Sequence, residues 1–287
     1  MKLALITRCK NEQYVNEFVN HYLNEGVDRI YIIDDESREG LYQQIVSCPQ
    51  VEIVYDIPFG YGDSSELKKM YKMIKDDYDW VLIVDLDEYV TTKKNRLKTL
   101  KDELLTTFKD SDCVKIPWVM MAFNGIESNP SCLLEGNVYR WNHDKKHENS
   151  SGKRKFRCRY NEIEVKCVFK PRAFDSCWDH GPVAVSDENV CTVDSVYNRR
   201  AKITHERNPS DPFYEELTEK DISQAFLVCY HYRATSKQHS LEKLKDSGFE
   251  DYKKLEARDF LDSDFAEIED LTLSQKSIIL PNLIIHK

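Results

Sequence analysis

The stretch Asp79-Trp80-Val81-Leu82-Ile83-Val84-Asp85-Leu86-Asp87-Glu88-Tyr89-Val90 decides the fold. Trp80–Val84 is too short for a typical helix and rich in β-branched residues, so it predicts a strand buried on both faces. Two carboxylates, Asp85 and Asp87, follow at its carboxyl end, where open α/β sheets bind their ligands. Such a pair suits Mg²⁺ or Mn²⁺ carrying a diphosphate. An isolated Asp-x-Asp can also simply end a strand, so the rest of the sequence must decide between the two interpretations.

The first hundred residues alternate predicted strands and helices. Strands are expected at Leu3–Arg8, Arg29–Ile33, Val51–Tyr55 and Trp80–Val84, and helices at Asn11–Glu25, at Gly40–Cys48 and from Ser64 to about Lys75. Four strands with helical crossovers predict a parallel, doubly wound sheet. Beyond residue 111 the pattern loosens into short strands, expected at Cys113–Val119, Val138–Trp141, Glu164–Phe169, Val193–Val196 and Phe226–Tyr232.

Two later segments carry runs of charge. The segment His143–Arg159 has seven Lys or Arg against two acids and is expected to be a mobile, solvated loop. The tail from Glu250 to Asp270 is acidic around a few apolar residues, which predicts a surface helix packed on the body. The basic loop is also a candidate contact for an anionic ligand, although a solvated loop is the preferred interpretation, and the tail implies no chemistry.

Composition excludes several classes of protein. With 287 residues, 41% of them hydrophobic, the chain can form one large domain, or one domain with an extension. A net charge of −9 argues against a general nucleic-acid binder. The apolar runs are far shorter than the roughly 20 residues of a membrane span, and the N-terminus lacks the pattern of a signal peptide. Nine scattered cysteines without a Cys-x-x-Cys pair argue against zinc and disulfides, so we expect a cytoplasmic protein with reduced thiols.

Three motifs follow the predicted strands in order. Asn11-Glu12 follows the first strand, Asp34-Asp35-Glu36-Ser37 the second, and Asp85-Leu86-Asp87-Glu88-Tyr89 the fourth. Together they resemble the GT-A glycosyltransferases, most closely the family-two-like and family-ninety-two-like groups. The resemblance covers residues 3 to about 90 and resumes thinly at Lys166–Pro171, Trp178–Pro182 and Tyr230–Lys243. No glycine-rich dinucleotide fingerprint or Walker lysine motif is present, which disfavours dinucleotide and P-loop enzymes.

The resemblance implies a fold and an activity. The fold class is α/β, with a GT-A (Rossmann-like), mostly parallel central sheet flanked by helices, a smaller mixed acceptor-side sheet and C-terminal helices. Residues 1–110 would be the nucleotide-sugar-binding half, residues 111–245 the acceptor-binding and catalytic half of the same domain, and residues 246–287 a C-terminal helical extension. The implied reaction moves a sugar, as in a hexosyltransferase, from a nucleoside-diphosphate sugar (UDP-sugar) to a hydroxyl of a glycan or protein-linked acceptor, with inversion and with Mn²⁺ or Mg²⁺.

The resemblance also assigns the donor site. Family members contact the nucleotide at the positions of Thr7, Arg8, Asn11 and Glu12. Asp34 and Asp35 would accept hydrogen bonds from the base or the ribose, and Ser37 would hold the turn. A helix N-cap is an equally good reading of Asp35.

The Asp-x-Asp turn would hold the metal. Asp87 is expected to coordinate the ion directly, while Asp85 either shares it or bonds the ribose and the donor sugar. Glu88 would orient the turn. Lys68, expected to face the loop Phe59–Gly62, is a candidate for neutralising phosphate, although a solvated helix face explains it as well.

The late segment offers a third metal ligand. An apolar strand ends at His231, where some metal-dependent families place a histidine ligand, and Lys237, with Arg233 as a second candidate, would contact the leaving phosphates. His180 competes as the ligand, and a structural role for His231 stays open.

The base that deprotonates the acceptor hydroxyl would be a carboxylate from the second half of the fold. Asp179 and Glu135 are the candidates, followed by Asp175, and no spacing argument selects one. Trp178, beside Asp179, presents a flat apolar face that suits a sugar ring. Two other functions stay open: a sugar nucleotidyltransferase, and an inactive carbohydrate- or nucleotide-binding module of the same fold.

Overall fold

The structure is a computed structural model. It describes residues 1–38, 48–54, 65–147, 163–183, 190–201, 217–246, 256, 259 and 261–279. Three expected features therefore lie wholly or mostly outside the described residues: the helix at Gly40–Cys48, the loop at Phe59–Gly62 and the segment from residue 148 to Arg159.

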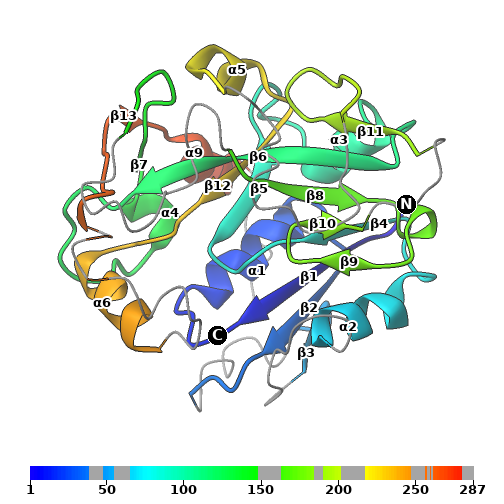
Figure 1. Cartoon of the computed structure of the whole chain (residues 1–287), viewed down its shortest axis with the longest axis horizontal. Coiled ribbons are helices and arrows are strands. Elements are labelled where there is room, and N and C mark those ends of the chain that lie inside the picture. Colours follow the sequence, from blue (N-terminus) through cyan, green and yellow to red (C-terminus); the bar gives the residue numbers. More distant parts are fainter. Residues whose placement is uncertain are drawn as a thin grey trace.

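The first half of the chain forms a parallel sheet. Strands β1 (Leu3–Cys9), β2 (Arg29–Asp34), β3 (Val51–Val54) and β4 (Trp80–Ile83) lie in the order β3-β2-β1-β4, and every pair is parallel (Figure 1). The predicted doubly wound arrangement is confirmed. Because all four strands run the same way, the loops after β1, β2 and β4 lie at one edge of the sheet.

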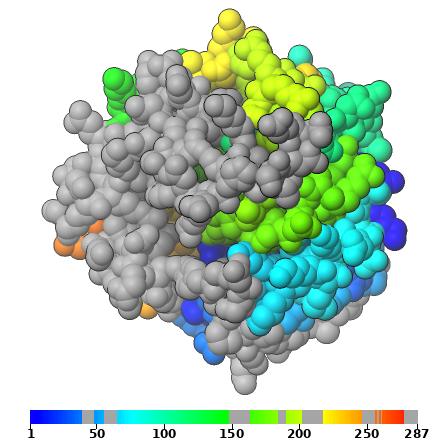
Figure 2. Space-filling view, turned by 45° about the vertical axis from the view of Figure 1, so that its right-hand side comes forward, coloured from blue at the N-terminus to red at the C-terminus, as the bar shows by residue number. Residues whose placement is uncertain are grey.

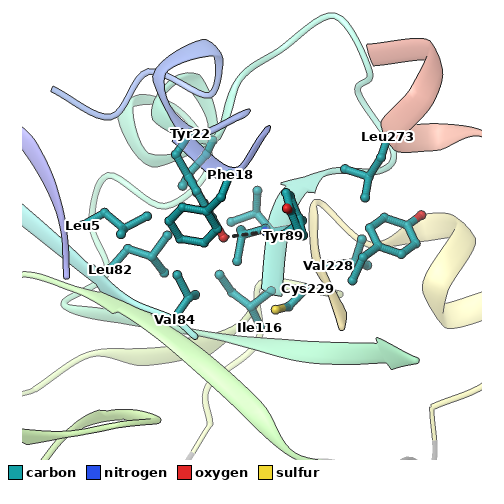
Figure 3. Close-up of a cluster of buried hydrophobic side chains, with 14 of the residues drawn as sticks. Leu5, Phe18, Tyr22, Leu82, Val84, Tyr89, Ile116, Val228, Cys229 and Leu273 are labelled. Carbon is teal, nitrogen blue, oxygen red and sulfur yellow. Dashed lines mark hydrogen bonds between the residues drawn. The ribbon is translucent and has the colours of Figure 1, made fainter. Parts of the chain in front are cut away.

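Both faces of this sheet are buried. Alternate residues of β1 and β4, such as Leu5 and Leu82, pack with helix α1 (Val15–Asn24), as Figure 3 shows. The residues between them, such as Ile6 and Val81, pack with helix α2 (Glu66–Ile74) on the other face. An unbroken apolar run from Trp80 to Val84 is the sequence pattern that such two-sided burial requires.

The two helices begin later than expected. Asn11 has a φ of +55°, in the left-handed region, so the chain turns before α1 begins at Val15. The N-cap of α2 is Ser65 rather than Ser64, because the Ser65 side chain accepts from the backbone N–H of Lys68.

The second half of the chain extends the same sheet. β8 (Val165–Phe169) pairs antiparallel with β4 on one side and with β6 (Cys113–Ala122) on the other, which joins the two halves into one sheet of eleven described strands. The expected smaller mixed sheet is therefore continuous with the parallel one.

The other elements are β5 (Glu88–Thr92), α3 (Leu100–Leu105), α4 (Leu133–Gly136), β7 (Tyr139–Arg140), η2 (Pro171–Ala173), β9 (Cys177–Trp178), β10 (Gly181–Pro182), β11 (Thr192–Asp194), α5 (Glu219–Gln224), β12 (Leu227–His231), α6 (Lys237–Asp246), β13 (Ile268–Glu269) and α9 (Thr272–Ile279).

Three details correct the sequence interpretation. Strand β5 was not expected, yet it pairs with β12 along its whole length. His143 and His147 are buried, so the start of the expected solvated loop packs into the fold. The tail contributes strand β13, which pairs with β7, and a buried Asp270, rather than only a surface helix.

Two further expectations concern thiols and membranes. Every cysteine within the described residues is a free thiol, as expected. No helix in the described parts of the chain has the length and apolar character needed to cross a membrane.

Candidate functional site

Asp85, Asp87 and Glu88 lie in a closed turn, here called the acidic turn (residues 85–88), between β4 and β5. The backbone N–H of Glu88 donates to the Asp85 carbonyl at 3.1 Å, and the backbone N–H of Asp85 donates to Glu88 Oε2 at 2.8 Å. These two bonds hold the turn at the end of β4, at the edge of the sheet where the loops after β1 and β2 also lie.

Asp85 lies between two cations. Arg8 Nε is 2.9 Å from Asp85 Oδ1, and Lys166 Nζ is 2.9 Å from Asp85 Oδ2. Burial acts to raise the pKa of Asp85, but Arg8 and Lys166 outweigh it and hold this pKa below its ordinary value. Asp85 is therefore a carboxylate with both oxygens engaged by the protein.

Asp87 faces α6 and β12. Lys243 Nζ, from α6, lies 2.7 Å from Asp87 Oδ2, and His231 Nε2 lies 3.7 Å from the same oxygen. Burial acts to raise the pKa of Asp87, yet Lys243 and His231 keep it well below the ordinary value. The Asp87 carboxylate is thus ionised.

The pairing of β5 with β12 brings a histidine to the acidic turn. Glu88 is the direct cross-strand partner of His231, and the Tyr232 N–H donates to the Asp87 carbonyl at 2.8 Å. Of the described residues, one set of side chains can hold a metal ion: Asp87, Glu88 and His231, with one ligand atom each within 4.8 Å of one another. This register explains how residues about 140 positions apart form one site.

The chemistry of this set fits a divalent metal ion. Glu88 Oε1 and His231 Nδ1 are buried without a hydrogen-bond partner, which is unusual for buried polar atoms. Burial raises the pKa of Glu88 to about 8; Lys166 opposes this, while Asp85 and Asp87 add to it. Burial also lowers the pKa of His231, which keeps the imidazole in its neutral, ligating form. Two carboxylates and an imidazole suit Mn²⁺, which accepts nitrogen more readily than Mg²⁺ does.

The set differs in one member from the expected Asp85, Asp87 and His231. Both oxygens of Asp85 are bonded to Arg8 and Lys166, whereas one oxygen of Glu88 has no partner. Asp85 thus anchors the turn, and Glu88 takes its place in the candidate metal set.

The loops after β1 and β2 are tied together at the same edge of the sheet. The Asn11 N–H donates to Ser37 Oγ at 2.9 Å, the Asn11 side chain accepts from the Arg38 N–H at 2.9 Å, and the Ser37 N–H donates to the buried Asp34 carboxylate. Asp35 pairs with Lys10 at 3.2 Å. The sequence motifs after the first and second strands are therefore one connected structure.

Glu12 and Thr7 lie in the same region. Burial raises the pKa of Glu12 to about 7; Lys243 lowers it, and the nearby Asp87 and Asp85 raise it further. The Thr7 side chain is buried in β1 and donates to the Arg8 carbonyl at 3.2 Å. Glu12 thus adds a fourth acidic group next to the acidic turn.

Asp179 and His180 form the turn between β9 and β10, beside the acidic turn. Burial acts to raise the pKa of Asp179, but His180, Lys166 and Arg8 lower it below the ordinary value. His180 Nδ1 is 2.9 Å from the Val165 carbonyl, and burial, then Lys166, lowers the pKa of His180 to about 3. His180 therefore packs as a neutral ring against β8.

Aromatic rings connect this hairpin to His231. Trp178 lies 4.8 Å from His180, His180 lies 5.4 Å from Trp118, and Trp118 lies 4.3 Å from His231, all between ring centroids. The row leads from the β9–β10 hairpin to the candidate metal set. Figure 2 shows the segment 163–183 (green) beside helix α2 (cyan) on one face of the molecule.

Other predicted residues lie elsewhere. Lys237 is partly exposed and pairs with the exposed Glu127. Glu135 is exposed on α4, and the exposed Asp175 pairs with Lys75. Lys68 is half-buried on α2, and the loop it was expected to face lies outside the described residues.

Two lysines of the site were not predicted. Lys243 lies six residues after Lys237 on α6, and it contacts Asp87 of the acidic turn at 2.7 Å. Lys166 is the single charged residue in the apolar strand Val165-Lys166-Cys167-Val168-Phe169. A lone lysine in a buried strand is a detectable signal, because such a charge must be paired.

Comparison with known proteins identifies the family. The model of glycosyltransferase family 92 matches residues 71–259, well over half of the chain. The chain belongs to glycosyltransferase family 92. The matched range includes the acidic turn, Lys166, the β9–β10 hairpin, His231 and Lys243. The loops after β1 and β2 precede it. No curated protein matches the chain.

Proposed function

We propose that this family 92 member is a metal-dependent, inverting GT-A glycosyltransferase that transfers a sugar, a hexose in our proposal, from a UDP-sugar to a hydroxyl of a glycan or protein-linked acceptor. One observation carries the proposal. Asp87, Glu88 and His231 form a metal-ligating set with partnerless buried atoms, at the carboxyl end of a parallel strand, inside the family match. This is the edge at which open α/β sheets bind nucleotides.

Different residues on the donor side have different proposed roles. Asp87, Glu88 and His231 would hold Mn²⁺, and a bound ion would stabilise the charge that develops on the departing diphosphate. Lys243 is placed to contact the same phosphates, since its ammonium already lies 2.7 Å from Asp87. Arg8 and Lys166 hold Asp85, and the tied loops after β1 and β2 would hold the nucleoside.

The acceptor side has one favoured base. Asp179 interacts electrostatically with Arg8, Lys166 and Asp85, and its lowered pKa keeps it ionised, as a proton acceptor must be. Glu135 is exposed on α4 and has no comparable connection in the described structure. Trp178, next to Asp179, is half-buried and offers a ring on which an acceptor sugar would stack.

The two alternative functions predict different ligands. A nucleotidyltransferase would bind a nucleoside triphosphate and release pyrophosphate, and a binding module would bind sugar or nucleotide without turnover. Membership of a glycosyltransferase family favours sugar transfer over the first. The partnerless ligand atoms at the acidic turn favour a metal-dependent activity over the second.

Thermal melting with nucleotides tests the proposal. The protein is melted with UDP, GDP, CDP and CTP, each with Mn²⁺ or with EDTA, because a ligand that binds the folded state raises the melting temperature. We expect UDP to stabilise the protein only when Mn²⁺ is present. Stabilisation by CTP with pyrophosphate release would support the nucleotidyltransferase instead. If no nucleotide shifts the melting temperature, the proposal is wrong.

A further inference from the structure

Lys166 contacts both halves of the candidate site. Its side chain is fully buried, and Nζ lies 2.9 Å from Asp85 Oδ2, 3.1 Å from Glu88 Oε2 and 2.8 Å from the Asp179 carbonyl oxygen. The first two acceptors belong to the acidic turn and the third to the β9–β10 turn. The ammonium donates hydrogen bonds to Asp85 and to the Asp179 carbonyl, and Glu88 is its second ionic partner in the acidic turn.

Strand register puts Lys166 at this junction. In the β4–β8 pair, Cys167 lies opposite Ile83, two residues before Asp85. The side chain of the neighbouring Lys166 therefore starts from the strand beside the end of β4 and reaches the turn that follows it. Its position is set by the sheet and not by a flexible loop.

The hairpin is held against β8 on both sides of Lys166. His180 Nδ1 bonds to the Val165 carbonyl at 2.9 Å. Gly181 lies so close to β8 that a Cβ atom there would be 2.7 Å from Cys167 Sγ, and its φ is +155°. Because a side chain would push the hairpin away, glycine is required for this contact.

Stability alone does not explain a lysine at this position. A buried charged group is costly to desolvate, and replacing a buried ion pair with apolar side chains is often neutral or stabilising. A lysine that is fully buried and shared by three acceptors does something that an apolar residue cannot do: it fixes the directions of two separate turns.

We propose that Lys166 is a positioning residue that holds the acidic turn and the Asp179 turn in one fixed arrangement. Lys166 does not reach substrate itself, and it acts through Asp85, Glu88 and Asp179. Its chemical role, alignment of the donor diphosphate with the base at the acceptor hydroxyl, rests on the proposed function. The bridge between the two turns is independent of that function.

Hydrogen exchange read by mass spectrometry tests the bridge in Lys166→Met. The matched control is Lys276→Met, because Lys276 is also buried and paired, with Glu25 at 2.6 Å and Thr91 at 2.9 Å, but bonds to the far end of β5 instead of to the acidic turn. We expect Lys166→Met to speed exchange in residues 84–89 and in residues 177–183, and Lys276→Met to speed it in neither. Unchanged exchange in either segment of Lys166→Met overturns the proposal.

A second variant covers the case in which Lys166→Met does not fold. Gly181→Ala keeps the lysine and displaces the hairpin from β8, so it breaks the same bridge from the other side. We expect faster exchange in both segments here too. An effect confined to the hairpin would show that the acidic turn does not depend on it, and the proposal would be wrong.

Calorimetric titration with Mn²⁺ and UDP tests the chemical role. In Lys166→Met we expect affinity to fall about 10- to 100-fold, the usual cost of losing a group that orients metal ligands. In Lys276→Met we expect affinity to stay unchanged, although both variants lose stability. An equal loss in both variants overturns the positioning role. If the wild type binds no UDP with Mn²⁺, the proposed function fails, and the exchange data still decide the bridge.

Discussion

Two buried groups of charged residues in this protein differ in how completely they are paired. The first is the acidic turn with its cations. The second, here called the Asp270 cluster, ties the C-terminal tail to the sheet, and Asp270 at its centre contacts Lys93 at 2.7 Å, Arg140 at 2.8 Å and Tyr230 at 2.9 Å. The remaining members of the cluster are Glu219 and Thr272.

The Asp270 cluster is balanced and complete. Two acids face two bases, and none of the buried side-chain oxygen and nitrogen atoms of its six residues, all of them described, lacks a hydrogen-bond partner. A cavity of about 370 Å³ lies beside it, but the charged groups of the cluster that line this cavity are already paired with one another. The cluster is therefore complete without a ligand, and we expect it to contribute to stability and specificity of packing.

The acidic turn is unbalanced and incomplete. Asp85, Asp87, Glu88 and Glu12 face three cations, and Glu88 Oε1 and His231 Nδ1 have no partner. Burial raises the pKa of Glu88 and Glu12, and the neighbouring carboxylates add to it, whereas in the Asp270 cluster the bases outweigh burial and lower the pKa of Asp270. Incomplete pairing of buried polar atoms therefore distinguishes the candidate metal site from the Asp270 cluster.

The largest expected effect is on metal-dependent binding. Asp87→Ala removes one of the three candidate metal ligands and the partner of Lys243, so we expect it to lose Mn²⁺-dependent UDP binding altogether, measured by calorimetry. The matched control is Asp270→Ala, which should bind UDP with wild-type affinity at temperatures where it is folded. If Asp87→Ala and Asp270→Ala lose UDP affinity equally, the acidic turn does not differ from the Asp270 cluster in ligand binding.

The next effect is on stability. Asp270→Asn leaves Lys93 and Arg140 with a poorer partner inside the fold, so we expect the free energy of unfolding to fall by about 3–5 kcal/mol, measured by urea titration. Glu52→Gln is the control, because its pair with Arg29 is substantially exposed and contributes at most about 1 kcal/mol. A loss for Asp270→Asn as small as that of the control would mean that the cluster is not a stabilising tether.

A third prediction separates two lysines of α6. Lys243→Met removes the cation next to Asp87, and we expect UDP affinity in the presence of Mn²⁺ to fall about tenfold, as for the loss of a hydrogen bond to a charged group. Lys237→Met should change it little, since Lys237 pairs with the exposed Glu127. If Lys237→Met instead lowers UDP affinity more than Lys243→Met does, Lys237 is the phosphate contact and Lys243 is not.

The last prediction concerns how stability depends on pH. The pKa of Glu88 is raised from 4.5 to about 8, so in the metal-free protein its contribution to stability is complete below 4.5 and is lost as the pH rises through about 8. Relative to Glu88→Gln, the wild type should lose at most about 1.4 kcal/mol of unfolding free energy per pH unit in this window. Urea titrations with EDTA at about pH 5.5 and about pH 7.5 measure the difference. If wild type and Glu88→Gln differ by the same unfolding free energy at both pH values, Glu88 is not the titrating group.

Much of the fold was predictable because it follows from local patterns. The apolar runs of β1, β2, β3 and β4 and their helical crossovers predicted the parallel sheet and its exposed edge. Strand β5 was missed because Glu88–Thr92 has only one residue, Val90, of plain aliphatic character, and it becomes a strand by pairing with β12. Four of its five residues are types that favour strands, so the absence of an apolar run, not unfavourable propensity, concealed it.

The site was predictable in part for the same reason. The Asp-x-Asp turn and the loops after β1 and β2 lie where the strand ends predicted, and His231 lies at the end of its predicted strand. Lys166 and Lys243 were not predicted, because they reach the acidic turn from 81 and 156 residues away along the chain. No local sequence pattern encodes such distances.

The sequence by itself determined the parallel core and the place of the acidic turn, since apolar periodicity and strand length are local properties of the chain. Only the tertiary structure decided the charge balance of that turn. The register of β5 against β12 brings Glu88 to His231, and the position of β8 beside β4 brings Lys166 to Asp85. Electrostatic interactions depend on distance in space, and that distance is set by packing between segments far apart in the sequence.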